Sequence, residues 1–122
     1  MSERDAGRRL CGYSVSLLHQ YLDNLILWIE SVAREMREGR ATSDRVLVWV
    51  EETEGMFDIA EGMSSLVSDT CPGYRSGEFL EGLRRARDEV RKGFERGPDG
   101  LLESVYHVRL ARDGWLPKAL RR

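Results

Sequence analysis

The chain has 122 residues, of which 41% are apolar and 33% are charged, and its net charge is −2. A chain of this length suits one domain around one core, so we expect a single helical-bundle domain over residues 1–122. The apolar fraction excludes a disordered chain, and the small net charge gives no general argument for a nucleic-acid or membrane partner.

Composition also bears on source and compartment. Arginine outnumbers lysine 17 to 2, a bias that a GC-rich genome explains and that predicts a bacterial source. The first ten residues are charged and lack the apolar run of a signal peptide. The apolar run LILWI at residues 25–29 is too short to span a membrane. We therefore expect a cytoplasmic protein.

The first predicted element is a long helix over residues 3–37. Apolar side chains recur there at every third or fourth position, which indicates one buried face. This seam comprises Cys11, Val15, Leu18, Leu22, Leu25, Ile29, Val32 and Met36. In the segment that follows, Gly39 is expected to end the helix and Ser43 to cap the next one.

The next two predicted elements are also helices. The second is expected over residues 44–68, because the dipeptide Pro72-Gly73 cannot continue a helix. The third is expected to begin at Ser76 and to end in the RGPDG segment at residues 96–100.

The last segment fits two structures. Residues 101–110 have the apolar spacing of a short helix, but Tyr106, Val108 and Leu110 also alternate as in a strand. No other segment offers a partner strand, so the helix is favoured. Beyond Gly114 we expect a tail docked by Trp115 and Leu116.

Together these elements predict an all-α fold. We expect an up-down antiparallel helical bundle of three long helices with a shorter C-terminal helix and tail. The size and the all-α pattern are similar to those of small prokaryotic immunity proteins, phage inhibitors and helical subunits of ribonucleoprotein effectors. That likeness concerns the fold alone and transfers no residue.

An acidic stripe follows one flank of the second predicted helix. Its carboxylates are Glu51, Glu54, Asp58 and Glu61. A matching stripe on the third helix contains Arg84, Arg87 and Arg91. Antiparallel packing is expected to place Glu61 near Arg87 and Asp58 near Arg91, as exposed salt bridges worth about 0.2–1 kcal/mol each.

The alternative for this stripe is a metal or acid–base site. His19 and Asp23 on the first helix would then lie near Asp58 and Glu61. The sequence has no Glu-x-x-His pairs of a di-iron bundle, no Cys-x-x-Cys pair and no phosphate-binding Gly-x-x-x-x-Gly-Lys loop. We therefore expect a protein that is not an enzyme, with no catalytic residue, cofactor or metal, although the stripe as a metal ligand set stays open.

A second apolar stripe lies on the other side of the same helix. It consists of Val48, Gly55, Ile59, Gly62 and Leu66. The two glycines each cost about 1 kcal/mol relative to alanine inside a helix, and small residues let another helix approach closely. Either the chain itself covers this stripe, or it binds another protein or a second copy. A homodimer is the simplest such assembly, and an adaptor, inhibitor or regulatory subunit is the first functional hypothesis.

The second functional hypothesis is a nucleic-acid-binding or ribonucleoprotein small subunit. The first 74 residues carry 7 basic and 13 acidic side chains, whereas residues 75–122 carry 12 basic and 8 acidic ones. Basic residues on the third helix and in the C-terminal part are the candidate phosphate contacts. They are Arg84, Arg85, Arg91, Lys92, Arg96, Arg109, Arg112, Lys118, Arg121 and Arg122.

The chain has two cysteines, Cys11 and Cys71. If the first two helices form an antiparallel hairpin, these residues lie at the same level of the bundle. We expect them to be neighbours and, in a reducing cytoplasm, to be free thiols without a metal.

Overall fold

Four helices make up almost all of the computed structural model, which describes residues 3–74 and 76–115. They are α1 (Glu3–Arg37), α2 (Ser43–Thr70), α3 (Ser76–Arg96) and α4 (Pro98–Trp115). The described residues contain no strand, so the all-α prediction is confirmed and the strand alternative for residues 101–110 is wrong. The predicted docking of the tail by Trp115 and Leu116 concerns side chains outside the described part of the chain.

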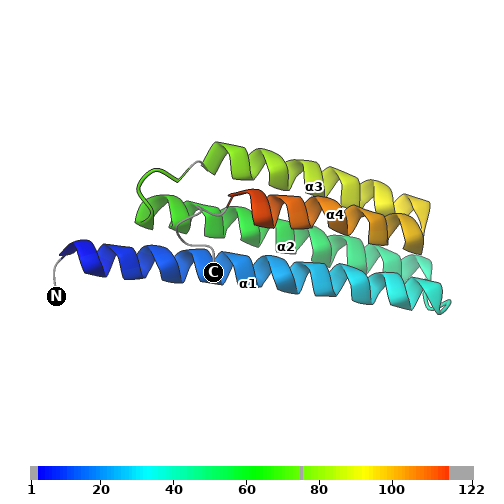
Figure 1. Ribbon diagram of the computed structural model, residues 1–122. Coiled ribbons are helices and arrows are strands. Elements are labelled where there is room, and N and C mark those ends of the chain that lie inside the picture. The colour runs from blue at the N-terminus through cyan, green and yellow to red at the C-terminus, as the bar shows by residue number, and fades with distance from the viewer. Residues whose placement is uncertain (1–2, 75, 116–122) are drawn as a thin grey trace.

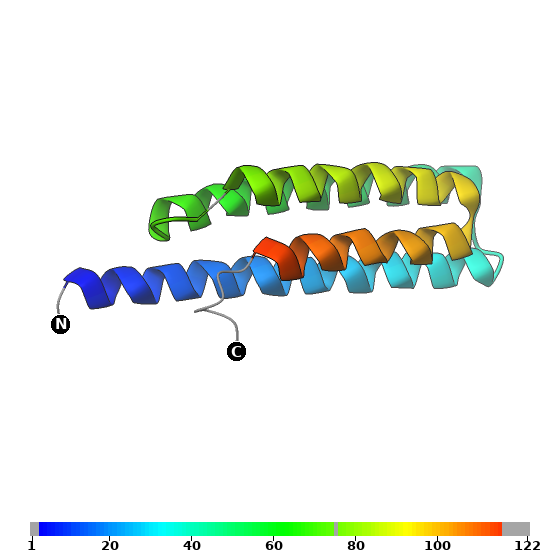
Figure 2. The same cartoon turned by 45° about the horizontal axis from the view of Figure 1, so that its top comes forward.

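Each helix packs against two others. α1 contacts α2 and α4, and α3 contacts the same two helices from the other side. The α1–α2 loop and the α3–α4 turn lie at one end of the molecule, which we call the turn end (Figures 1 and 2). The α2–α3 connection lies toward the opposite end, where the first turns of α1 project beyond the other helices (Figure 1).

The helix ends follow from local chemistry. Gly39 and Gly97 have φ angles of 80° and 98°, in the left-handed region where glycine carries no steric penalty. Gly97 alone separates α3 from α4, and Pro98 then begins α4 with the φ angle that its ring already fixes. The cap of α2 is Thr42 rather than the predicted Ser43, and its hydroxyl accepts a hydrogen bond from the Arg45 amide at 3.3 Å.

The core lies where the four helices face one another. The predicted α1 seam is buried from Val15 to Val32, and its end members Cys11 and Met36 are half-buried. Each of the other three helices contributes at least one large side chain that is fully buried. These include Phe57 of α2, Phe79 and Leu83 of α3, and Leu101 and Val105 of α4. The described helices span lengths of 35, 28, 21 and 18 residues in chain order, and no described helix is both long and apolar enough to cross a membrane.

One buried polar contact fixes how α1 lies against α2. The indole Nε1 of Trp28 donates a hydrogen bond to the Thr53 hydroxyl at 2.9 Å, and that hydroxyl donates in turn to the Trp49 carbonyl at 2.6 Å. Thr53 is only 2% exposed and keeps its bond to Trp49 within α2, so sliding α1 along α2 would leave the half-buried indole N–H of Trp28 without its acceptor.

The two cysteines are neighbours, as predicted, but they are not free thiols. Cys11 and Cys71 form a disulfide with a Cα–Cα distance of 4.9 Å, which is within the range that a disulfide needs. The prediction of reduced thiols is therefore wrong for this structure. The helical phase of Cys11 points it toward α2, and Cys71 is the C-cap of α2, where an extended backbone turns the chain out of the helix. Beside the disulfide, the Thr70 hydroxyl donates to the Ser14 hydroxyl at 3.1 Å.

Candidate protein-interaction site

The second apolar stripe of α2 is open to solvent in the single chain. Val48 and Ile59 are each 52% exposed and Leu66 is 45% exposed. The buried residues of α2, among them Phe57, Ala60 and Val67, lie on the other side of the helix, against α1 and α3. The chain therefore does not bury this stripe among its own described residues.

The two glycines of the stripe leave bare backbone at the surface. A Cβ atom added to Gly55 or to Gly62 would meet nothing within 4 Å. Packing among the described residues therefore gives no reason for glycine at either position, although each glycine weakens the helix. What the glycines provide is a shallow surface on which another backbone or a bulky side chain can lie close to α2.

An ion-pair ladder joins α2 to α3 along one flank of this stripe. Arg87 contacts Glu54, Asp58 at 2.8 Å and Glu61 at 3.7 Å. The expected approach of Arg87 to Glu61 is thus observed. The expected pair of Asp58 with Arg91 is wrong, because Arg91 binds Glu54 instead, with Nε 2.5 Å from Oε1. The observed register differs from the expected one by about one helical turn.

The ladder shifts the pKa values of two of its members. Partial burial by itself raises the pKa of Glu54, but the hydrogen bonds and charges of Arg91 and Arg87 outweigh it, and the net pKa is lowered. The pKa of Arg87 is raised in the same way, since its contacts with Asp58 and Glu54 outweigh the effect of burial. Three of the four carboxylates of the acidic stripe are therefore paired with arginine side chains of α3.

The structure does not bring together the residues of the alternative metal site. His19 Nδ1 lies 3.5 Å from Asp23, but Asp23 faces α4, where Arg112 binds it at 2.5 Å. Asp58 instead faces Arg87 on α3. Within residues 3–74 and 76–115 no group of three or more His, Cys, Asp or Glu side chains is placed to hold a metal ion.

Three of the candidate phosphate contacts are paired with carboxylates of the same chain. Arg91 binds Glu54 on α2, Lys92 lies 3.5 Å from Glu89, and Arg112 is held by Asp23 on α1. Arg84, Arg85, Arg96 and Arg109 are exposed and form no ion pair with any described residue. Lys118, Arg121 and Arg122 lie outside the described residues.

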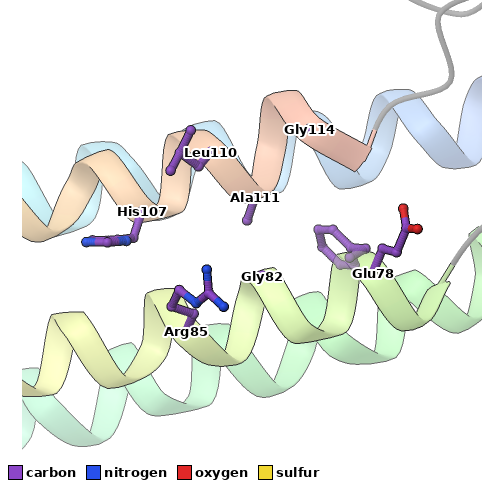
Figure 3. A pocket seen from close by; sticks show the side chains of 8 residues that line it. Glu78, Gly82, Arg85, His107, Leu110, Ala111 and Gly114 are labelled. Atoms are coloured by element: carbon purple, nitrogen blue, oxygen red, sulfur yellow. The ribbon is translucent and has the colours of Figure 1, made fainter.

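The structure also contains a feature that the sequence pattern did not indicate. A pocket of about 190 Å³ lies between α3 and α4, with Phe79, Gly82 and Arg85 on one side and His107 and Ala111 on the other (Figure 3). The sequence signal was weak, because the lining residues of α3 lie 22 to 36 positions from those of α4 and each is unremarkable within its own helix.

Comparison with known proteins adds no assignment. No protein-family model matches this chain, and no curated protein or solved structure is significantly similar to it.

Proposed function

We propose that the protein is a non-enzymatic adaptor or regulatory subunit that self-associates as a homodimer through the apolar stripe of α2. The proposal includes an up-down antiparallel arrangement of the helices in the bundle that presents this stripe. It also includes the cytoplasm as the compartment of the protein. One observation carries the proposal: three large apolar side chains lie together on the exposed face of one long helix, with two glycines that no contact among residues 3–74 and 76–115 requires.

The residue spacing suits a two-fold pairing of α2 with itself. In an antiparallel pair centred at Phe57, Val48 of one copy lies opposite Leu66 of the other. With the same centre, Ile59 lies opposite Gly55, so the bulky side chain meets bare backbone. A two-fold interface requires such self-complementary pairs, because every contact occurs twice.

The expected affinity follows from the area available. Fully burying a Val, Leu or Ile side chain is worth about 1.5–3 kcal/mol, and about half of each of the three is still exposed. Covering them on both copies contributes roughly 5–9 kcal/mol. Association itself costs about 4 kcal/mol or more. We therefore expect a weak dimer whose population rises with protein concentration.

Sedimentation equilibrium over a wide concentration range tests this proposal. The wild-type mass is expected to rise from the 14.0 kDa of one chain toward twice that value. Ile59→Asp places a charge at the centre of the interface and is expected to hold the chain at the monomer mass. Leu27→Asp is the matched control, since Leu27 is 64% exposed on α1, outside the stripe. A wild-type chain that stays monomeric at millimolar concentration, or an Ile59→Asp chain that dimerises like wild type, refutes the proposal.

Fewer observations support the nucleic-acid hypothesis than support the homodimer. Arg84, Arg85 and Arg109 are exposed and lack acidic partners among the described residues. Phosphate contacts release counterions, so binding of a duplex or single-stranded oligonucleotide would weaken steeply with added salt. If neither oligonucleotide binds at low salt, the nucleic-acid hypothesis is refuted.

A further inference from the structure

The pocket between α3 and α4 exists because small residues face each other across the two helices. A Cβ atom added to Gly82 would lie 3.8 Å from the Cα and Cβ atoms of Ala111, an ordinary contact distance. Neither residue has a side chain long enough to fill the space beside this contact. The pocket surface beside these two residues is largely apolar. Phe79 and the half-exposed Leu110 also line it.

A cationic side chain that no described carboxylate pairs with lies at one end of this pocket. Arg85 forms no ion pair with any described residue, whereas Arg87 and Arg91 on the same helix are each bound to carboxylates. Figure 3 shows the guanidinium of Arg85 extending from α3 toward α4, on the side of the pocket where the imidazole of His107 lies. Its planar set of N–H donors fits a carboxylate in a two-pronged geometry.

His107 supplies a second polar group at the same end. Its Nε2 atom is 3.8 Å from Glu89, beyond hydrogen-bonding distance, so its ring nitrogens keep capacity for another partner. Glu78 stands at the opposite end of the pocket, two helical turns from Arg85 or about 10 Å along α3. The guanidinium of Arg85 therefore makes its end of the pocket suitable for one anionic group.

We propose that this pocket binds a small monocarboxylate that carries a short apolar chain. Arg85 and His107 would hold the carboxylate, and the chain would lie over Gly82 and Ala111. The volume of about 190 Å³ equals about six water molecules at 30 Å³ each, which sets the size of the acid. This site is separate from the α2 stripe and does not depend on dimerisation.

Titration of the full chain with sodium hexanoate, followed by amide NMR shifts, tests this site. Saturable shifts are expected at Gly82 and Ala111 in the wild type. Arg85→Gln is expected to weaken binding about tenfold or more, because a charged hydrogen-bonding partner of the carboxylate is lost. Arg84→Gln is the matched control, since Arg84 is also exposed and unpaired among the described residues but does not line the pocket.

Further ligands separate the possible outcomes. Hexylamine and inorganic phosphate are expected not to produce the hexanoate shifts. An acetylated peptide that ends in leucine distinguishes two sources of the same chemistry: tighter binding of that peptide assigns the site to the end of a polypeptide, and tighter binding of hexanoate assigns it to a free acid. Equal binding of phosphate, or equal affinity in the Arg85→Gln variant, overturns the proposal. Gly82→Leu fills the pocket and is expected to abolish binding; its far-UV circular dichroism shows whether it remains folded.

Discussion

The two ends of the α3–α4 pair use glycine in opposite ways. Near the turn end, a Cβ atom on Gly93 would lie 2.9 Å from the Cα of Leu101, so the missing side chain is what allows the helices to touch. Two to three turns away, Gly82 and Ala111 are farther apart, and the missing side chain leaves a pocket instead. Glycine thus permits close helix packing at one end and leaves a pocket at the other. The difference lies in the distance between the backbones of α3 and α4.

At the end of the bundle opposite the turn end, the Cys11–Cys71 disulfide joins α1 to the end of α2. Breaking this disulfide is expected to have the largest effect on stability. The bond closes a loop of 60 residues. In the chain-entropy account such a loop contributes about 4 kcal/mol by restricting the unfolded chain. Reducing agent is therefore expected to lower the free energy of unfolding by about that amount in urea titrations followed by circular dichroism.

The double variant Cys11→Ser/Cys71→Ser is the control, since its stability must not respond to the reducing agent. A thiol count on protein made in a reducing cytoplasm shows which state the cell provides, because cytosolic disulfides are rare. Equal urea midpoints with and without the reducing agent, while the thiol count shows the bond broken, would contradict the expected stabilisation.

The next largest effect is expected at the tightly packed end of the α3–α4 pair. Gly93→Ala places a Cβ atom against backbone atoms of Gly100 and Leu101, at 3.0 and 2.9 Å. These backbone atoms cannot shift without moving the neighbouring residues of α4. Overpacking of this kind costs about 1–3 kcal/mol, which exceeds the gain of alanine over glycine in a helix. Thermal unfolding measures the loss. Gly82→Ala is the matched control and is expected to be neutral or stabilising, and a control that loses as much as Gly93→Ala would show that the two ends do not differ.

A smaller effect is expected from the ion pairs between α2 and α3. Because the pKa of Glu54 is lowered in the folded chain, its ionised form stabilises the fold at neutral pH. That contribution is present above the ordinary glutamate value of 4.5 and is lost as the pH falls through the lower folded pKa. Arg87→Gln is expected to cost about 1 kcal/mol at pH 7.

Urea titrations at a series of pH values measure both parts of this expectation. The Arg87→Gln variant should lose less stability on acidification than wild type, because less lowering of the Glu54 pKa remains. Arg84→Gln, which removes an unpaired arginine of α3, is the control. Parallel pH profiles for wild type and Arg87→Gln would show that Arg87 does not lower the pKa of Glu54.

How far the sequence anticipates these features depends on whether they are local. The α1 seam and the breaks at Gly39 and Pro72-Gly73 follow from periodicity and backbone preference within one segment, and the bounds of the first three helices agree with the prediction within a few residues. The last helix is longer than predicted, since α4 continues past Leu110 to Trp115. The pairing of Arg91 with Glu54 rather than Asp58 depends on the register between two helices, which no single-helix pattern fixes. The pocket and the contact at Gly93 depend on backbone separations, for which the sequence has no signal beyond a small residue.

The smallest expected effect concerns a third kind of glycine, one with neither a close neighbour nor a pocket. A Cβ atom on Gly62 would meet nothing within 4 Å, so Gly62→Ala is expected to raise the monomer's free energy of unfolding by up to about 1 kcal/mol through helix propensity alone. If α2 pairs with itself, the same methyl group lies in the interface and reduces the close approach of the second copy. Thermal unfolding of dilute protein should therefore show a gain, while sedimentation at high concentration shows a weaker dimer. Ser65→Ala, at the position directly before Leu66 but about 100° around the helix from it and exposed, is the control and should leave the dimer unchanged. A Gly62→Ala chain that dimerises as well as wild type would assign the glycine no part in association.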